Sequence, residues 1–373
     1  MSVAVSPPIA ITVEVDGDGW MWLIDSGYDG QPIVILSQPL DKVSDASDDM
    51  RKALEAFKRI VEGNWRDLSA EAKKEHLDGL KAKGRLLTGA LFGGRQDEFA
   101  EHLARLASPI ITQFSRGSSQ QPLLEFAVLN DGAGDFFLGE KCICRLKVVD
   151  PKKSRVLRAQ FVSRPRGEAR LVGYAEDNQL RSACQSHGAP DPSRSDQQIS
   201  IMMDLVGPGE KPIVLCSLSE SLPSHELDDL QNWIAGKYHV IHFNCGADHS
   251  DRPVLRLRQG AKIGVEEMYH PAADFHGGLV FLNACSSAIG KSSLTTSIAE
   301  FFRQRRASCI LCTTGPIEDG FATKLACIFY DHLKNGMNVV SALISARARL
   351  LQEEGHPMAL NYTYIGHDDY RLV

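Results

Sequence analysis

The sequence GLVFLNAC, residues 278–285, is a short apolar run that ends in a cysteine. Its length and its content of Leu, Val and Phe are typical of a buried β-strand. Similar runs occur on both sides of it, and helical patterns lie between them. Strands that alternate with helices favour βαβ units and a mostly parallel sheet. The other runs that predict this sheet are RLVGYA (170–175), KPIVLCSL (211–218), YHVIHFNC (238–245) and ASCILCTT (307–314).

The helical pattern at 318–336 is the clearest of those in this half of the chain. Apolar residues recur on one of its faces at helical spacing, and Gly336 supplies a stop signal. Such a face is expected to cover a sheet, which makes this half an α/β sandwich. Three further helices are predicted at 224–236, 292–306 and 338–355.

The N-terminal part of the chain has a different pattern. Residues 10–37 contain three strand-like runs, separated by the turn signals DGDG and GYDGQ. Helices are predicted at 44–64 and 96–107, and more strand-like runs follow. We therefore expect an α+β region over residues 1–168 and an α/β domain over residues 169–373.

Composition and charge exclude several classes of protein. The 373 residues are 43% hydrophobic and 24% charged, as in a globular protein of one large or two medium domains. The 41 basic and 47 acidic side chains give a net charge of −6, which supplies no overall attraction for nucleic acid or an acidic membrane. No apolar stretch approaches the roughly 20 residues of a membrane-spanning helix. Since the nine cysteines suit free thiols, we expect a soluble cytoplasmic protein.

Two of the predicted strands run into residues that can carry chemistry. YHVIHFNC leads into GADHSD, and GLVFLNA leads into Cys285. Ligands and reactive groups gather beyond the carboxyl ends of parallel strands, and a helix that starts just after a cysteine helps to stabilise a thiolate. Cys285 is therefore a candidate nucleophile, although cysteine is also a common buried residue and a structural role stays open.

These residues resemble the CHAT peptidases, caspase-like cysteine proteases of the same broad clan as separase and metacaspases. The family shows one strand that ends in HFxCHG or HFxGHG and a later strand that ends in LxACxS or LxACxT. This chain has HFNCGA at 242–247 and LNACSSA at 282–288, and the resemblance covers at least residues 170–373. It implies a caspase-like three-layer αβα sandwich with a mostly parallel sheet. The region 1–168 would then hold a degenerate caspase-like half.

The resemblance also implies a mechanism. Cys285 would attack a peptide carbonyl, and the oxyanion would be held by its own backbone amide and by that of Ala247 or Gly246. A histidine at the neighbouring strand end would carry the proton in the family, but this sequence has Gly246 at that position. The chain would be a bacterial antiviral defence or cell-death protease that acts on a protein substrate and is activated by a protein partner.

Two other histidines lie near Gly246 in the sequence. His242 lies four residues earlier in the same predicted strand, roughly 13 Å down the sheet, and is expected to pack or hydrogen-bond in the interior. His249 lies in a predicted polar loop that could fold back toward Cys285, which makes it a candidate substitute base. Otherwise the chain is a natural pseudoprotease that acts as a protein-binding module, or a deliberately disabled form with much reduced activity.

Several remaining signals have both a functional and a structural interpretation. Asp319, just past the fifth strand, could line a specificity pocket for a basic side chain or could interact with a helix dipole, and Glu318 shares this ambiguity. Basic residues between 145 and 170 suit a solvated hairpin or a docking strip for an acidic partner. The turn GKSS at 290–293 lacks the glycine that a phosphate loop needs. The CxC and CxxC pairs lack partners at metal-ligand spacing, so no metal and no cofactor are predicted.

Overall fold

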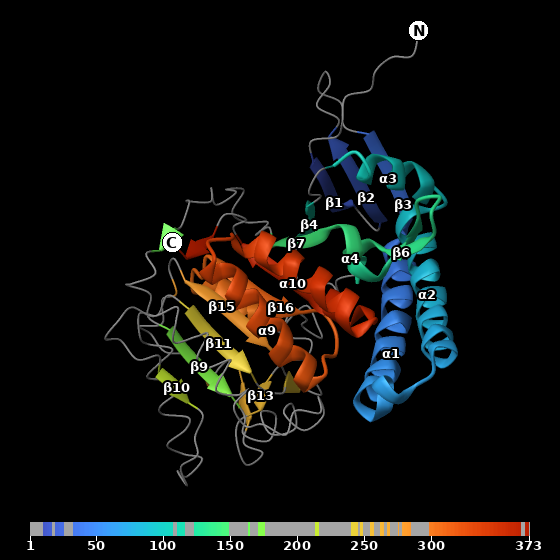
Figure 1. Cartoon of the computed structure of the whole chain (residues 1–373). Coiled ribbons are helices and arrows are strands. Elements are labelled where there is room, and N and C mark those ends of the chain that lie inside the picture. The colour runs from blue at the N-terminus through green and yellow to red at the C-terminus, as the bar shows by residue number, and fades with distance from the viewer. Residues whose placement is uncertain are drawn as a thin grey trace. The chain divides into compact units, whose positions relative to one another are not determined.

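The chain divides into two compact units, Met1–Val156 and Leu157–Val373, and each is described by itself. Figure 1 labels their elements. The predicted boundary at 168/169 falls in 165–170, outside the described residues, and stays a prediction. The computed structural model describes residues 10–16, 19–25, 33–106, 110–115, 123–148, 163–164, 171–175, 213–215, 240–244, 247–248, 254–256, 262–264, 267–268, 275, 278–284, 298–366 and 370–372.

The N-terminal unit contains a mixed sheet with the strand order β7-β4-β1-β2-β3. The three predicted N-terminal strands are confirmed and pair antiparallel, whereas β4 and β7 run parallel to β1. In β2 the residues alternate between buried and partly exposed, so one face of the strand lies in the core. The strands are β1 (Ala10–Asp16), β2 (Gly19–Asp25), β3 (Ile33–Pro39), β4 (Ile110–Ser115) and β7 (Ile143–Val148).

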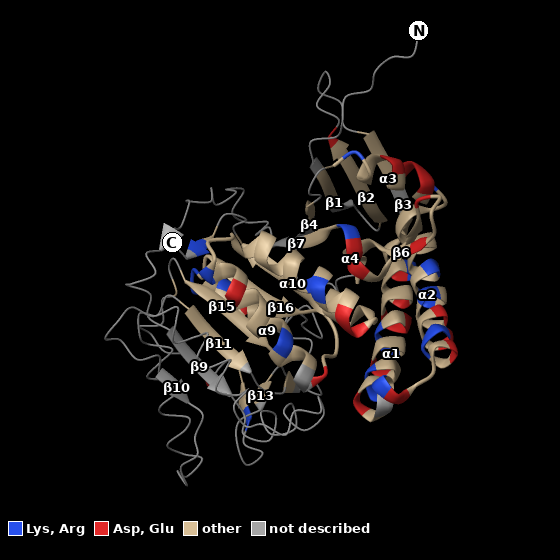
Figure 2. Cartoon of the chain, in the orientation of Figure 1, with Lys and Arg blue, Asp and Glu red and all other residues tan. Residues whose placement is uncertain are grey.

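Three helices accompany this sheet: α1 (Leu40–Asn64), α2 (Ala70–Phe92) and α3 (Gln96–Leu103). The sequence predicts α1 and α3 but not α2. The long helices α1 and α2 lie side by side, and Figure 2 shows basic and acidic residues mixed along them. The core of the unit contains a cluster of aromatic rings, in which Trp22 lies 4.6 Å from both Phe92 and Phe99 between ring centroids.

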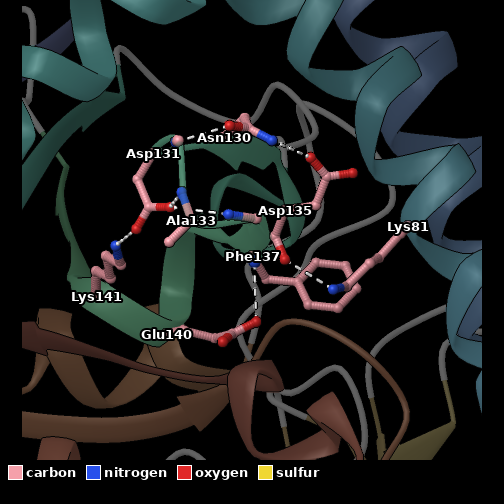
Figure 3. Close-up of polar contacts among 10 residues, drawn as sticks. Lys81, Asn130, Asp131, Ala133, Asp135, Phe137, Glu140 and Lys141 are labelled. Atoms are coloured by element: carbon pink, nitrogen blue, oxygen red, sulfur yellow. Dashed lines mark hydrogen bonds and ion pairs between the residues drawn. The ribbon is translucent and has the colours of Figure 1, made fainter.

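A small hairpin, β5 (Val128–Asn130) with β6 (Asp135–Phe137), leads into the short helix α4 (Leu138–Lys141). Figure 3 shows its polar contacts. The carboxylate of Asp131 accepts a hydrogen bond from the backbone N–H of Ala133 at 3.0 Å and pairs with Lys141, whose hydrogen bond lowers the pKa of Asp131. Lys81 of α2 donates to the carbonyl of Asp135 at 2.8 Å, so the hairpin is tied to α2.

The C-terminal unit contains the predicted mostly parallel sheet, in the order β10-β9-β11-β15-β16-β17. All five predicted strands are present and parallel, and β17 is antiparallel to β16. In chain order this is 2-1-3-4-5 with a sixth strand added, a doubly wound arrangement. The strands are β9 (Leu171–Ala175), β10 (Ile213–Leu215), β11 (Val240–Asn244), β15 (Leu279–Asn283), β16 (Cys309–Thr313) and β17 (Tyr362–Gly366).

Helices cover both faces of this sheet. His242 and Phe243 are consecutive in β11 and point to opposite faces. His242 contacts Tyr330 of α9 (Asp319–Lys334), and Phe243 contacts Phe302 of α8 (Ile298–Gln304), with ring centroids 5.6 Å apart in each pair. The three-layer αβα sandwich is therefore confirmed.

The predicted apolar stripe of α9 is buried, and α10 (Val339–Glu354) packs beside α9 (Figure 1). The short 3-10 helix η5 (Pro357–Asn361) leads from α10 toward β17. The helix predicted at 224–236 lies outside the described residues. Within the described part of the chain, no helix combines the length and the apolar character needed to cross a membrane.

Short strands complete the C-terminal unit. After β11, β12 (Ala247–Asp248), β13 (Val254–Arg256) and β14 (Lys262–Gly264) form a small antiparallel sheet. Near the end of the chain, β18 (Arg371–Leu372) pairs in parallel with β8 (Ser163–Arg164).

Candidate active site

The two strands expected to carry the catalytic residues are neighbours in the sheet. β11 and β15 are parallel and paired along their full length, from Val240 opposite Leu279 to Asn244 opposite Asn283. Both strands therefore end level at the same edge of the sheet. The candidate residues Gly246 and Cys285 each lie two positions beyond the last residue of their strand. These two residues lie outside the described residues, so their roles stay predictions.

The chain directly after Gly246 differs from the expected polar loop. Ala247 and Asp248 form β12 and pair with Leu255 and Val254 of β13. This pairing fixes the backbone at the position where the resemblance implies an oxyanion donor, Ala247. His249, the candidate substitute base, follows β12 immediately and lies outside the described residues.

His242 is an interior residue, as predicted. It is 2% exposed, its Nδ1 lies 2.9 Å from the Tyr330 hydroxyl, and its ring meets Phe281 edge-on. Burial lowers the pKa of His242 to about 3, because the charged imidazolium would lose its hydration. The imidazole is therefore neutral near pH 7, and its place within the strand suits packing, not proton transfer at the strand end.

A buried asparagine ends the strand that precedes Cys285. Asn283 is 3% exposed, and its Nδ2 donates a hydrogen bond to the carbonyl of Ala322 in α9 at 3.1 Å. The hydroxyl of Tyr362 in β17 donates to Oδ1 of Asn283. One amide thus joins β15 to a helix and to a strand that are remote in sequence.

The next residue is held by the neighbouring strand. Thr313, the last residue of β16, donates its hydroxyl to the carbonyl of Ala284 at 2.5 Å. Further along, the side-chain amide of Asn361 donates a hydrogen bond to the backbone carbonyl of Pro316 at 2.8 Å. The backbone carbonyl of Asn361 accepts the N–H of Thr314 at 2.8 Å. Polar side chains therefore brace the backbone at the carboxyl ends of both β15 and β16.

No motif in the sequence predicts the bracing role of these residues. Asn283 and Thr313 are polar residues at the ends of otherwise apolar strands, and this pattern is the signal that could have found them. Their partners, such as Tyr362, could not be deduced in the same way because they come from segments far along the chain.

Of the two acidic residues at the start of α9, the structure describes the side chain of Glu318 only. Glu318 is buried, and its carboxylate accepts the backbone N–H of Phe321 at 2.6 Å, so it caps the helix. This confirms the helix-terminus interpretation for Glu318. Asp319 is the first residue of α9, but its side chain lies outside the described part, and its pocket role stays a prediction.

The cysteine pairs noted in the sequence are buried free thiols: Cys142, Cys144, Cys309 and Cys312. Within the described ranges, no group of three or more His, Cys, Asp or Glu side chains is arranged to hold a metal ion. The GKSS turn at 290–293 lies outside those ranges, as does most of the basic segment at 145–170.

Comparison with known proteins adds the family. The CHAT domain model matches residues 117–364, which includes the segment 123–146 of the N-terminal unit. Comparison with curated proteins gives no match. Among solved structures, separase from Saccharomyces cerevisiae, in its complex with securin, is similar at a TM-score of 0.57 and 10% identity, over 98% of this chain and 30% of that chain.

The Arg-specific cysteine proteinase gingipain R of Porphyromonas gingivalis is similar at a TM-score of 0.49 and 10% identity, over 76% of this chain and 69% of that chain. At such low identity the structural likeness to separase shows the fold alone, a caspase-like one. The family match extends over about two thirds of the sequence. The chain is therefore a member of the CHAT domain family with a caspase-like, cysteine-peptidase-like fold.

Proposed function

We propose that this chain is a cysteine endopeptidase of the CHAT type that cleaves a protein substrate through Cys285. The observation that carries the proposal is the register of β11 and β15, which end level at Asn244 and Asn283. Gly246 and Cys285 follow at equal offsets in the sequence. Residues that leave adjacent parallel strands at the same edge can serve one substrate carbonyl.

In the proposed reaction the Cys285 sulfur attacks the carbonyl carbon of the scissile peptide bond. The oxyanion is stabilised by the backbone amides of Cys285 and Ala247. Collapse of this intermediate releases the amine and leaves an acyl-enzyme, which water hydrolyses. A base beside the sulfur takes up the thiol proton and passes it to the leaving amine.

Glycine at position 246 removes that base. A thiol with a pKa near 8.5 is only a few per cent thiolate at pH 7, and the leaving amine loses the acid that the family's histidine would supply. We therefore propose that this form has impaired activity. General acid–base catalysis contributes typically 10²–10⁴-fold to a rate, and this is the scale of the loss.

The decisive experiment places a histidine at position 246. Gly246→His should raise cleavage of unfolded casein and of a fluorogenic peptide panel, varied at the residue before the scissile bond, by about 10²-fold or more. Gly246→Gln is the matched control, because it adds a polar side chain that cannot titrate. Cys285→Ala in the Gly246→His chain should abolish cleavage. Restored cleavage that survives Cys285→Ala would overturn the proposal.

The alternative function is a pseudoprotease that binds proteins without cleaving them, and Gly246 is the observation that favours it. On this alternative a peptide electrophile does not label Cys285, and Gly246→His gives no gain in cleavage. Labelling of Cys285, located by peptide mass mapping among the nine cysteines, separates the two functions before any substrate is known.

Two residues refine the proposal. His249 is the candidate substitute base for the residual cleavage that remains with Gly246, so His249→Asn should remove that residual cleavage. Asp319 lines a pocket for a basic side chain, so Asp319→Asn should lower cleavage after Arg and Lys more than after other residues. Unchanged residual activity in the first variant, or an unchanged preference in the second, would contradict these roles.

The resemblance is the ground for a proposed cellular role. We propose a bacterial, cytoplasmic protease in antiviral defence or cell death that a protein partner activates. Expression of the Gly246→His chain with and without its genomic neighbours, followed by phage challenge and viability counts, tests this role. Protection that requires both Cys285 and a neighbouring gene product is the expected result.

A further inference from the structure

The backbone carbonyl of Ala284, the residue before Cys285, is held by a side chain from the next strand. The Thr313 hydroxyl donates a hydrogen bond to the carbonyl of Ala284 at 2.5 Å, and Thr313 is fully buried. The carbonyl of residue 284 and the amide of residue 285 belong to one planar, trans unit. Because of this planarity, we expect a bond that fixes the direction of the Ala284 carbonyl to set the direction of the N–H that follows it as well.

A second set of contacts fixes the strand end on which this peptide group sits. The amide of Asn283 joins the Tyr362 hydroxyl to the carbonyl of Ala322. A buried amide left without its partners is destabilising, so this arrangement resists displacement of the end of β15. β15 is thereby held to α9 and β17 at the residue that precedes Ala284.

We propose that Thr313, supported by Asn283 and Tyr362, is a positioning residue that orients the backbone amide of Cys285 as an oxyanion donor. This inference rests on the proposed function. The donors of an oxyanion hole stabilise the transition state only if they already point at the developing charge. Thr313 meets this need from β16 without touching the substrate.

Thr313→Val tests this role because valine keeps the β-branched shape and has a methyl group in place of the hydroxyl. In the Gly246→His chain we expect kcat to fall by about 10- to 100-fold with little change in KM, since the interaction is made in the transition state. Tyr362→Phe should act in the same direction and more weakly, because it acts through Asn283.

The matched controls are buried residues of the same sheet and of α9. Thr363→Val removes another buried threonine hydroxyl, one strand away in β17. Tyr330→Phe removes a fully buried tyrosine hydroxyl that contacts His242 instead of Asn283. Both controls should lower the unfolding midpoint about as much as their partners do, and should leave kcat unchanged. A kcat loss of equal size in the controls would show that Thr313 acts through stability alone, and would overturn the inference.

A pair of thiol reagents separates orientation of the amide from reactivity of the sulfur. With a peptide aldehyde, the Cys285 sulfur adds to the carbonyl carbon, the C=O π bond opens, and the oxygen takes up the thiol proton to give a hemithioacetal. This adduct places its oxygen in the oxyanion site, whereas alkylation by iodoacetamide displaces iodide and does not use that site. Thr313→Val should weaken aldehyde inhibition about tenfold or more and leave the rate of Cys285 alkylation unchanged.

The outcomes distinguish this inference from the proposed function. If Cys285-dependent cleavage is present and Thr313→Val alters neither kcat nor aldehyde affinity, the positioning role is wrong and the peptidase function stands. If the Gly246→His chain neither cleaves the panel nor binds the aldehyde, the proposed function fails and the positioning role fails with it. Loss of aldehyde affinity with an unchanged alkylation rate supports both.

Discussion

The buried residue His242 should make the free energy of unfolding depend on pH. Its pKa in the folded chain is about 3, against an ordinary value of 6.5 in the unfolded chain. As the pH falls below 6.5 the unfolded chain takes up a proton that the folded chain does not. The free energy of unfolding is therefore full above pH 6.5 and falls toward pH 3, by up to roughly 1.4 kcal/mol per pH unit.

Urea unfolding at pH 7.5 and at pH 5 measures this effect. His242→Gln should flatten the dependence, because it removes the titrating group. Tyr330→Phe is the control, since it removes the hydrogen-bond partner of His242 and keeps the imidazole. His102, whose pKa is also lowered by burial, contributes equally in all three chains. A His242→Gln chain as sensitive to acid as the parent would show that His242 is not the source.

The role of a single residue can be predicted from the sequence when it depends on the residue's own strand, but not when it depends on partners in distant segments. The interior position of His242 follows from its place in an apolar strand, and the structure confirms it. The roles of Asn283 and Thr313 depend on partners in other elements: the hydrogen bond from Tyr362 to Asn283 joins residues 79 positions apart. Pairing over such a separation is decided by the packing of the sheet, which no local pattern contains.

Among the helices and strands, α2 offers a test of helix packing, because it carries glycines at three interior positions: Gly79, Gly84 and Gly89. A Cβ added at Gly79 or Gly89 would meet no atom within 4 Å, whereas at Gly84 it would lie 2.5 Å from Val128 Cγ2 and 2.6 Å from the Phe126 carbonyl oxygen. Gly79→Ala and Gly89→Ala should each stabilise the N-terminal unit by about 0.5–1 kcal/mol. Gly84→Ala should destabilise it, because the backbone of the neighbouring segment must move.

Thermal or urea unfolding of the three variants, side by side with the parent, measures these differences. The three substitutions are the same chemical change in one helix, so helix propensity alone predicts gains of one sign for all of them. A stabilised Gly84→Ala chain would mean that α2 does not approach the β5 segment as closely as the structure has it.

The same glycines explain why the sequence did not predict α2. Gly is the weakest helix former after Pro, and three of them interrupt the apolar pattern. The capping signals were nevertheless present: the Ser69 hydroxyl accepts the N–H of Ala72, and Gly93 ends the helix in the left-handed conformation. By contrast, α9 was predicted correctly because its apolar stripe is continuous and it ends near a glycine.

On the scale of the whole molecule, the boundaries of the family match do not coincide with those of the two compact units. The match begins at residue 117, inside the N-terminal unit, and so takes in the β5–β6 hairpin and β7 as well as the parallel sheet. The resemblance seen in the sequence was strongest from residue 170 onward, where the catalytic motifs lie. The motifs that carry chemistry are short runs of specific residues, whereas the strands that precede them can be recognised only by their hydrophobic pattern.

Because the chain divides into two compact units, we expect it to unfold in two separable transitions. Three of the four tryptophans, Trp20, Trp22 and Trp65, lie in the N-terminal unit, so fluorescence reports chiefly on that unit, while far-UV circular dichroism reports on both. Gly84→Ala should shift the fluorescence transition to lower urea. Gly315→Ala should leave it in place and shift the remaining dichroism change, because the added Cβ would lie 2.3 Å from Asn361 Oδ1 in the C-terminal unit. Both substitutions moving a single common transition would instead show that the two cores fold as one.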